Sequence, residues 1–337
     1  MQNRDHVSRG GNTPLRIKTG LLAASLFVLA SLLTGCFGNS NDAPGGSSGN
    51  AQPSSTPEPL APTFPGLGGV IMAPLRIDAT ESGWLLVTDP KRKSVHRVDP
   101  KTLRSVQSLH IEGTPLAVGM LAGKILVGVK EAHSIEMFSH TGTPIGSLSE
   151  PGVVDYPGDL AIEGTAGLVF VLDGTVRDVK IFKLADRSLV GTIGTGLLQS
   201  PSGLAVDPSR QEILVSDYGS SLEKASLKII SYAPETTGEL VATMTAGSCG
   251  FFGCTGGFSR PRGLAVRDSR IFLSDALLGQ VLIFDRATLL KVGELGPPDP
   301  ALRVLRLPSD VSINAAGDVY VTSTLAKSIV VFPGGAL

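Results

Sequence analysis

Six copies of one short pattern run along most of this chain, and they constrain its fold more than any other feature. Each copy begins at a proline and continues with three short apolar runs separated by Asp, Pro, Ser and Gly, the residues of tight turns. The copy at 201–232 is the clearest. A sheet this small cannot bury its own faces, so each copy needs the others. The prolines are Pro74, Pro115, Pro157, Pro201, Pro261 and Pro308.

The spacing of these prolines identifies the repeating unit. Successive prolines are 41 to 47 residues apart, except for one interval of 60 between the fourth and fifth. A fourth apolar run closes most copies, at 106–111, 145–148, 189–193, 240–244 and 292–295. A period of about 40 to 45 residues with four strands per unit is typical of a propeller blade. We therefore predict an all-β, six-bladed β-propeller.

The two ends of the repeat array differ from the rest. The sixth copy lacks a fourth run, whereas an unmatched apolar stretch at 69–72 precedes the first copy. We predict that 69–72 completes the last blade and closes the ring, because closure covers a sheet edge that would otherwise be exposed. The alternative is that 69–72 belongs to the first blade alone.

The repeat also resembles a known family. Pro-x-Gly-Leu-Ala-Val-Asp at 201–207, then Ile-Leu-Val-Ser-Asp at 213–217 and an apolar third run, is similar to the NHL repeat. The resemblance is closest in the fourth and fifth copies, fair in the third and sixth, and weaker in the first two, where the inner-strand glycine is absent. It covers about Val70 to the end of the sequence. NHL proteins are six-bladed β-propellers, so the resemblance implies the same fold.

The N-terminal segment has the features of an export signal. Four basic residues precede an apolar run at 21–33, which is too short to span a bilayer comfortably. The run ends in Leu-Thr-Gly-Cys at 33–36, which resembles the lipobox of bacterial lipoproteins. That resemblance implies a signal peptide at 1–35 and lipidation of Cys36. Because Phe37 rather than Asp follows, it also implies an outer-membrane location in a Gram-negative cell. An ordinary secretory signal with a chance cysteine is the alternative.

The next segment lacks the apolar content of a folded domain. From Cys36 to residue 66 the chain is rich in Asn, Ser, Gly, Pro and Thr, and it cannot bury enough surface to fold. We interpret 36–66 as a flexible linker and 67–337 as the propeller. A linker of roughly 30 residues has an r.m.s. span of about 30 Å, so the propeller would lie near the membrane. The net charge of −1 gives no support for a nucleic-acid partner.

An aspartate ends the second apolar run in four of the six copies. A ring of carboxylates would suggest cation binding. We favour a role in turns, because an Asp side chain accepts hydrogen bonds from N–H groups two residues further on, and because each of these aspartates belongs to a different blade. The four are Asp89, Asp173, Asp217 and Asp275.

Two cysteines lie in the Gly-rich insertion that lengthens the fourth copy. For an exported protein we predict a disulfide between Cys249 and Cys254, which would pin a six-residue loop. A metal pair is the alternative, but zinc needs four ligands and no His stands nearby in the sequence. Between the cysteines, Phe251 and Phe252 are candidate contacts for a partner or a lipid surface. They would otherwise fold back on the blade edge.

The residues expected around the central tunnel bear on catalysis. Gluconolactonase-like propeller hydrolases hold a divalent cation at the tunnel mouth with Glu, Asn and Asp. The matching positions here carry Arg76, Asp159, Arg262 and Asp310. Two carboxylates and two guanidinium groups suit ion pairing better than a site for a hard cation. Haem and phosphate-loop motifs are also absent from the sequence, and the repeats contain no nucleophile elbow.

These observations lead us to predict a lipid-anchored binding or scaffold protein of the cell envelope, without catalytic residues, metal or cofactor. Its expected contacts are the membrane, through the N-terminal lipid, and another envelope protein. The four tunnel residues are candidate contacts for that partner. The alternatives are a metal-dependent hydrolase or lyase with a site at the tunnel mouth, and a structural part of a larger envelope complex.

Overall fold

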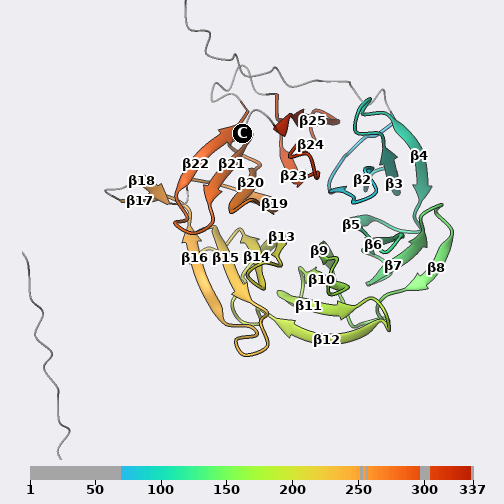
Figure 1. Ribbon diagram of the computed structural model, residues 1–337, viewed down its shortest axis with the longest axis horizontal. Helices are drawn as coiled ribbons and strands as arrows, with labels where there is room; N and C mark the ends of the chain where they lie inside the picture. The colour runs from blue at the N-terminus through green and yellow to red at the C-terminus, as the bar shows by residue number, and fades with distance from the viewer. Residues whose placement is uncertain (1–69, 251–252, 256, 297–303, 335–337) are drawn as a thin grey trace, which may run out of the picture. The chain divides into compact units, whose positions relative to one another are not determined.

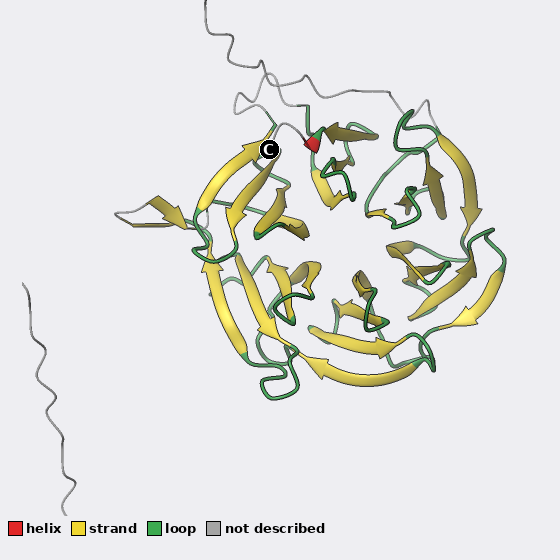
Figure 2. Cartoon of the chain, in the orientation of Figure 1, coloured by secondary structure: helices red, strands yellow, loops and turns green. Residues whose placement is uncertain are grey.

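The predicted six-bladed β-propeller is confirmed. The computed structural model describes residues 70–250, 253–255, 257–296 and 304–334, which form six antiparallel blades arranged in a ring (Figure 1) and one separate two-stranded sheet. Within these ranges the regular secondary structure is β-strand, and the short red piece in Figure 2 is a 3-10 turn at Gly334. None of the described residues belongs to a helix long and apolar enough to cross a bilayer. The predicted signal peptide, Cys36 and the whole predicted linker lie outside the described residues.

In each blade the first strand lines the channel and the following strands pair in sequence order toward the rim. Blade one holds β1 Ile77–Ala79, β2 Leu85–Asp89, β3 Ser94–Val98 and β4 Ser105–His110. Blade two holds β5 Pro115–Leu121, β6 Lys124–Val129, β7 Ser134–Ser139 and β8 Pro144–Ser147. Blade three holds β9 Pro157–Glu163, β10 Leu168–Asp173, β11 Asp178–Lys183 and β12 Ser188–Ile193.

The remaining blades follow the same plan. Blade four holds β13 Pro201–Asp207, β14 Glu212–Asp217, β15 Ser226–Ser231 and β16 Leu240–Thr245. Blade five holds β19 Pro261–Arg267, β20 Arg270–Asp275, β21 Gln280–Asp285 and β22 Lys291–Leu295. Blade six holds β23 Pro308–Ile313, β24 Val319–Ser323 and β25 Ser328–Phe332. Between blades four and five, β17 Ser248–Gly250 and β18 Gly253–Thr255 form a separate hairpin.

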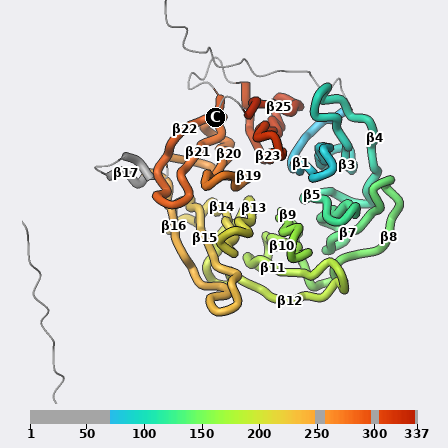
Figure 3. Tube along the Cα trace, in the orientation of Figure 1, coloured from blue at the N-terminus to red at the C-terminus, as the bar shows by residue number. Residues whose placement is uncertain are grey.

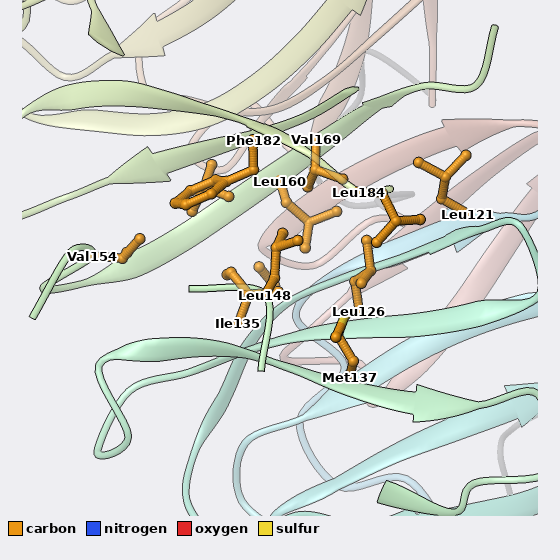
Figure 4. Packing of buried hydrophobic residues seen from close by; sticks show 12 residues of the cluster. Leu121, Leu126, Ile135, Met137, Leu148, Val154, Leu160, Val169, Phe182 and Leu184 are labelled. Atoms are coloured by element: carbon orange, nitrogen blue, oxygen red, sulfur yellow. The ribbon is translucent and has the colours of Figure 1, made fainter. Parts of the chain in front are cut away.

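The apolar core lies between successive blades. Second strands such as β10 are almost entirely buried, because both faces of the sheet are covered by neighbouring blades. The outer strand β4, by contrast, alternates half-buried and exposed residues, as expected for a strand at the rim. Figure 4 shows one of these layers, in which Leu126 and Ile135 of blade two pack against Leu160 and Phe182 of blade three.

Among the described residues, the predicted N-terminal strand is not found in the ring closure. We expected 69–72 to complete the last blade, but 70–72 form no strand, and the described part of blade six has three strands. Ile71 instead inserts its side chain into the core shared by blades one and six. The N–H of Met72 donates a hydrogen bond to Asp89 of blade one. The prediction is therefore wrong for 70–72, and Gly69 lies outside the described residues.

Side chains and backbone groups join blade six to blade one instead. In Figure 3 the red end of the propeller lies beside its blue beginning. Four hydrogen bonds connect the first and last blades and so hold the ring closed. Each of these bonds links residues more than 230 positions apart in sequence. They run from Thr324 Oγ1 to the Pro74 carbonyl (2.6 Å), from Thr322 Oγ1 to the Leu75 carbonyl (3.1 Å), from the Ile77 N–H to Asp310 (2.9 Å) and from the Ala79 N–H to Ser312 Oγ (3.0 Å).

The predicted turn role of the strand-end aspartates is confirmed. The fully buried Asp217 accepts a bond from the Gly219 N–H two residues further on, at 2.8 Å. It also accepts from the N–H groups of Gln199 and Ser200, which precede the inner strand. Burial opposes ionisation, but these donors and the nearby Lys228 ammonium outweigh it, so the pKa of Asp217 lies below its usual value. Each such carboxylate thus ties two loops of its blade together.

Candidate functional site

The centre of the ring holds a buried ion-pair cluster at the end of the channel where the inner strands begin. Arg76, just before β1, places its Nη1 3.0 Å from Asp159 of blade three and 3.6 Å from Asp310 of blade six. Its Nη2 donates to the carbonyl oxygens of Gly158 (2.9 Å) and Ser202 (2.5 Å). One guanidinium group therefore contacts four oxygen atoms from three other blades, blades three, four and six.

The two carboxylates of the cluster also hold the inner strands. Asp159 accepts from the Leu204 N–H of blade four at 2.9 Å, and Asp310 accepts from the Ile77 N–H of blade one at 2.9 Å. Arg76, Asp159 and Asp310 are all buried. The sequence favoured ion pairing among four residues, and three of them, Arg76, Asp159 and Asp310, do form ion pairs. A role as partner contacts stays a prediction.

Burial and mutual charge set the titration of the cluster. Burial lowers the pKa of Arg76, but Asp159 and Asp310 outweigh it and raise that pKa further above its usual value. Burial raises the pKa of Asp159, with Arg76 opposing the change. Burial also raises the pKa of Asp310, and the neighbouring Asp159 adds to the rise while Arg76 opposes it. Two carboxylates and one guanidinium group would carry a net −1, so the site favours retaining one proton.

The glycines of the repeat motif make room for this arrangement. A Cβ atom on Gly263 would lie 2.0 Å from the Asp310 carboxylate. A Cβ atom on Gly203 would lie 2.0 Å from the carbonyl oxygen of Arg262. Each glycine of Pro-x-Gly thus permits the neighbouring blade to approach the channel closely.

Arg262 differs from the expected pattern. It is half-buried, and within the described part of the chain it has no ion pair with Asp159 or Asp310. Its guanidinium carbon lies 5.9 Å from the ring centre of Tyr218, while Arg260 lies 5.0 Å from the same ring. Burial and the nearby positive charge of Arg76 lower the pKa of Arg262, although Tyr218 opposes the change. The cluster therefore contains one of the two predicted guanidinium groups.

Beyond the cluster, the channel widens into a cavity of about 270 Å³. Residues of the inner strands line it, among them Val118 and Ile162, and its wall also includes Asp159 and Asp310 of the cluster. Asp78 is a charged residue on this wall, and one carboxylate oxygen accepts from the Met120 N–H at 2.9 Å. Burial raises the pKa of Asp78 to about 7, the Met120 N–H opposes the rise, and Glu81 adds to it. Sequence reasoning missed Asp78, although its place in the first inner run was a usable signal.

A divalent cation does not fit the cluster. Such an ion needs several oxygen ligands converging on one point, and here the converging oxygens already contact the cationic Arg76. A second cation beside the guanidinium would meet like-charge repulsion in a buried place. In the described ranges, no group of three His, Cys, Asp or Glu side chains is placed to hold a metal ion.

The hairpin of β17 and β18 carries the two cysteines. It stands out beyond the rim between β16 and β22 (Figure 1). Its register places Cys249 directly opposite Cys254. Phe251 and Phe252 lie outside the described residues, so their predicted role as contact residues stays a prediction.

The architecture defines the chain as a six-bladed β-propeller, and solved structures of other proteins share it. Hydrazine synthase of Kuenenia stuttgartiensis is similar over 80% of this chain and 97% of its own, with a TM-score of 0.59 and 12% sequence identity. XC5397 of Xanthomonas campestris, described as a gluconolactonase, is similar over 78% of this chain and 86% of its own, with a TM-score of 0.60 and 16% identity. At these identities the likeness shows the fold alone. No family model and no curated protein matches the sequence, so membership of the NHL family stays a prediction.

Proposed function

We propose that this protein is a non-catalytic binding protein of the cell envelope, held to the membrane by a lipid on Cys36. It presents its loops to another envelope protein. The observation that carries the proposal is the Arg76 cluster, because the oxygen atoms that converge at this end of the channel contact a guanidinium group, which opposes a metal ion at the same place. Functional residues on rigid scaffolds commonly lie on loops, and the carboxylates at the centre of this ring already contact Arg76.

The first test separates this proposal from the alternative that the protein is a metal-dependent hydrolase. That alternative is suggested by the propeller fold that the chain shares with XC5397. Purified protein is analysed for bound Ca²⁺, Mg²⁺ and Zn²⁺, and its thermal unfolding is measured with and without each ion. Hydrolysis of gluconolactone is assayed in parallel. We expect substoichiometric metal, unchanged melting temperatures and no turnover. A stoichiometric ion together with lactone hydrolysis would replace this proposal with the enzyme.

The binding activity itself is tested by crosslinking in intact cells followed by affinity purification of the membrane-extracted protein. The same envelope protein should be recovered repeatedly with the wild-type chain. It should be lost when residues of the contacting loops are replaced, and retained when a residue of the opposite face is replaced. Recovery that does not depend on either set of loops would count against a specific binding surface.

The anchor and the disulfide are separate parts of the proposal. Lipidation predicts that a labelled fatty acid is incorporated into the wild-type chain and not into Cys36→Ala. For the disulfide, the support is that directly opposed strand residues have Cα atoms about 4.5 to 5.5 Å apart, which lies in the range of disulfides. Thiol titration of the unfolded, unreduced protein should find no reactive Cys249 or Cys254. Two free thiols would contradict the pairing.

A further inference from the structure

The two faces of the ring differ in the turns that they expose. In a four-stranded antiparallel blade, the turn between the second and third strands lies on the face where the inner strand begins. These turns are 90–93, 130–133, 174–177, 218–225, 276–279 and 324–327. We call the face that they form the turn face.

Four successive blades present an exposed apolar side chain at this turn. The exposed fractions are 51% for Val176, 95% for Leu222, 55% for Leu277 and 61% for Leu325. Single exposed apolar residues are common on any protein surface. Here all four lie in the turn between the second and third strands of neighbouring blades, so the exposed apolar residues are gathered on one face, as expected for an interaction surface.

The buried turn aspartates hold several of these apolar tips in place. Asp173 accepts bonds from the N–H groups of Thr175 and Val176, both at 3.1 Å. Asp275 accepts from the N–H groups of Leu277 and Leu278, at 3.0 and 2.9 Å. A tip that is already ordered loses little conformational entropy when it binds.

The turn face is also basic. The six turns contain seven Lys or Arg residues and two Glu residues, a net charge of +5. The described loops that join successive blades on this face add two basic and three acidic residues, which leaves +4. The turns of the opposite face contain five basic and seven acidic residues, a net charge of −2. The whole chain carries −1, so the charge is separated between the faces.

The chain also enters the propeller at the turn face. Val70, the first described residue, lines a shallow surface pocket with Arg92 and His110 of blade one. Met72 then donates to Asp89, directly before the 90–93 turn. The proposed linker that leads to Cys36 is therefore attached at the rim of the basic and apolar face.

From these three observations we propose that the turn face docks on the surface of an anionic lipid bilayer. Apolar tips that insert at the interface, combined with nearby Lys and Arg, are the combination that binds anionic membranes. The basic turn of blade one, with Lys91, Arg92 and Lys93, lies against the lipid headgroups, and the apolar tips of blades three to six enter the interface. The attachment of the linker rests on the proposed lipid anchor, whereas the charge and the apolar tips do not.

Tryptophan fluorescence of the full chain on vesicles tests the docking. The sequence has one tryptophan, Trp84, in the turn between β1 and β2 on the opposite face. Leu325→Trp adds a reporter on the turn face, and Ala316→Trp adds one at the other end of the same blade. Both sites are exposed. The vesicles contain phosphatidylcholine with or without phosphatidylglycerol, and their acyl chains carry bromine, which quenches tryptophan on contact.

We expect Leu325→Trp to gain a quenched component on phosphatidylglycerol vesicles, while wild type and Ala316→Trp do not. High salt should weaken the effect, because it screens the exposed charges. Equal quenching of both reporters, or of neither, would overturn the proposal. Absent quenching together with a dimer that Leu222→Ser breaks would assign the face to a second copy. Absent quenching with capture of one protein partner that Leu222→Ser abolishes would assign it to that protein.

The full chain with Cys36→Ala separates docking from anchoring. If the face docks, Leu325→Trp in this chain is still quenched, at a higher lipid concentration. Adding Leu222→Ser should then raise the lipid concentration for half-maximal quenching about tenfold. If wild type floats with vesicles but no reporter is quenched at any lipid concentration, the anchor stands and the docking is wrong. If wild type and Cys36→Ala bind alike, with Leu325→Trp quenched, the docking stands and the anchor is wrong.

Discussion

Replacing Arg76 by alanine is the sharpest test of how the ring is held at its centre. The substitution leaves the carboxylates of Asp159 and Asp310 buried without their cation, and it removes the donor to the Gly158 and Ser202 carbonyls. Removing one partner of a buried ion pair typically costs about 3 to 5 kcal/mol. For a domain of this size, each kcal/mol corresponds to a shift in melting temperature of about 2 to 4 °C. We therefore expect Arg76→Ala to melt on the order of 10 °C below wild type at neutral pH.

The loss should depend on pH in a defined direction. The pKa values of both carboxyls are raised in the folded wild type, and without Arg76 they rise further. A folded-state pKa above the unfolded value means that the protonated form is favoured in the fold. The corresponding stability is fully present below the unfolded pKa of about 3.9, and it is lost as the pH rises through the folded pKa. The deficit of Arg76→Ala should therefore be smallest near pH 4 and grow toward pH 8.

A divalent cation should rescue this variant and leave wild type unchanged. Without the guanidinium group, two carboxylates and two carbonyl oxygens face one space, and water can complete the coordination of Ca²⁺. A ligand at about 100 times its dissociation constant stabilises the fold by about 2.7 kcal/mol. Calorimetry with and without Ca²⁺ measures both effects, with Arg76→Ala/Asp159→Asn as the control that lacks one ligand. Two results would show that Arg76 does not act as the cation of this site. One is that Arg76→Ala and wild type have the same melting temperature at every pH, and the other is that Ca²⁺ raises both melting temperatures equally.

Three further predictions concern single positions. Asp217→Asn should cost about 2 to 3 kcal/mol in denaturant unfolding at pH 7, because several N–H groups lose a charged acceptor. The wild-type advantage should disappear as the pH falls below about 4, since the pKa of Asp217 is lowered in the fold. Burial raises the pKa of Asp78 to about 7, so wild type should lose stability as the pH rises from about 4 to 7. Asp78→Asn should not show this loss, and identical pH profiles of the melting temperature for the two proteins would contradict the prediction. Gly263→Ala should displace Asp310 and lower the melting temperature at least as much as Arg76→Ala, whereas Gly83→Ala, in an open turn with φ +80°, should cost only about 1 kcal/mol.

Much of this fold could be predicted because each blade is a local structure. The turn residues and apolar runs lie within about 45 residues of each other, so the sequence pattern alone locates the strands. Pro201, Pro261 and Pro308 each begin an inner strand, as predicted. The turn role of the aspartates was equally local, because Asp217 and Gly219 are two residues apart.

Ring closure could not be predicted in the same way. The apolar stretch at 69–72 suggested a strand, but hydrophobicity alone does not distinguish a strand from a single side chain that fills a core. Ile71 does the latter. The bond between Ile77 and Asp310 spans 233 residues, and no local pattern indicates such a partner. The contacts of Arg76 with the Gly158 and Ser202 carbonyls could not be predicted either. Every residue has a backbone carbonyl oxygen, so residue identity does not indicate which one accepts a hydrogen bond.

The centre and the turn face of this propeller differ in where their charges find partners. At the centre, Arg76 is enclosed by oxygen atoms, so its charge is balanced within the ring. On the turn face, basic residues outnumber acidic ones in the described turns and loops, and exposed leucines lie in the same turns. A ligand that bound at the centre would have to break buried ion pairs, whereas one that bound the turn face would only displace water and counterions. The free energy for binding is therefore more readily available at the turn face, which is why the experiments on function are best directed there.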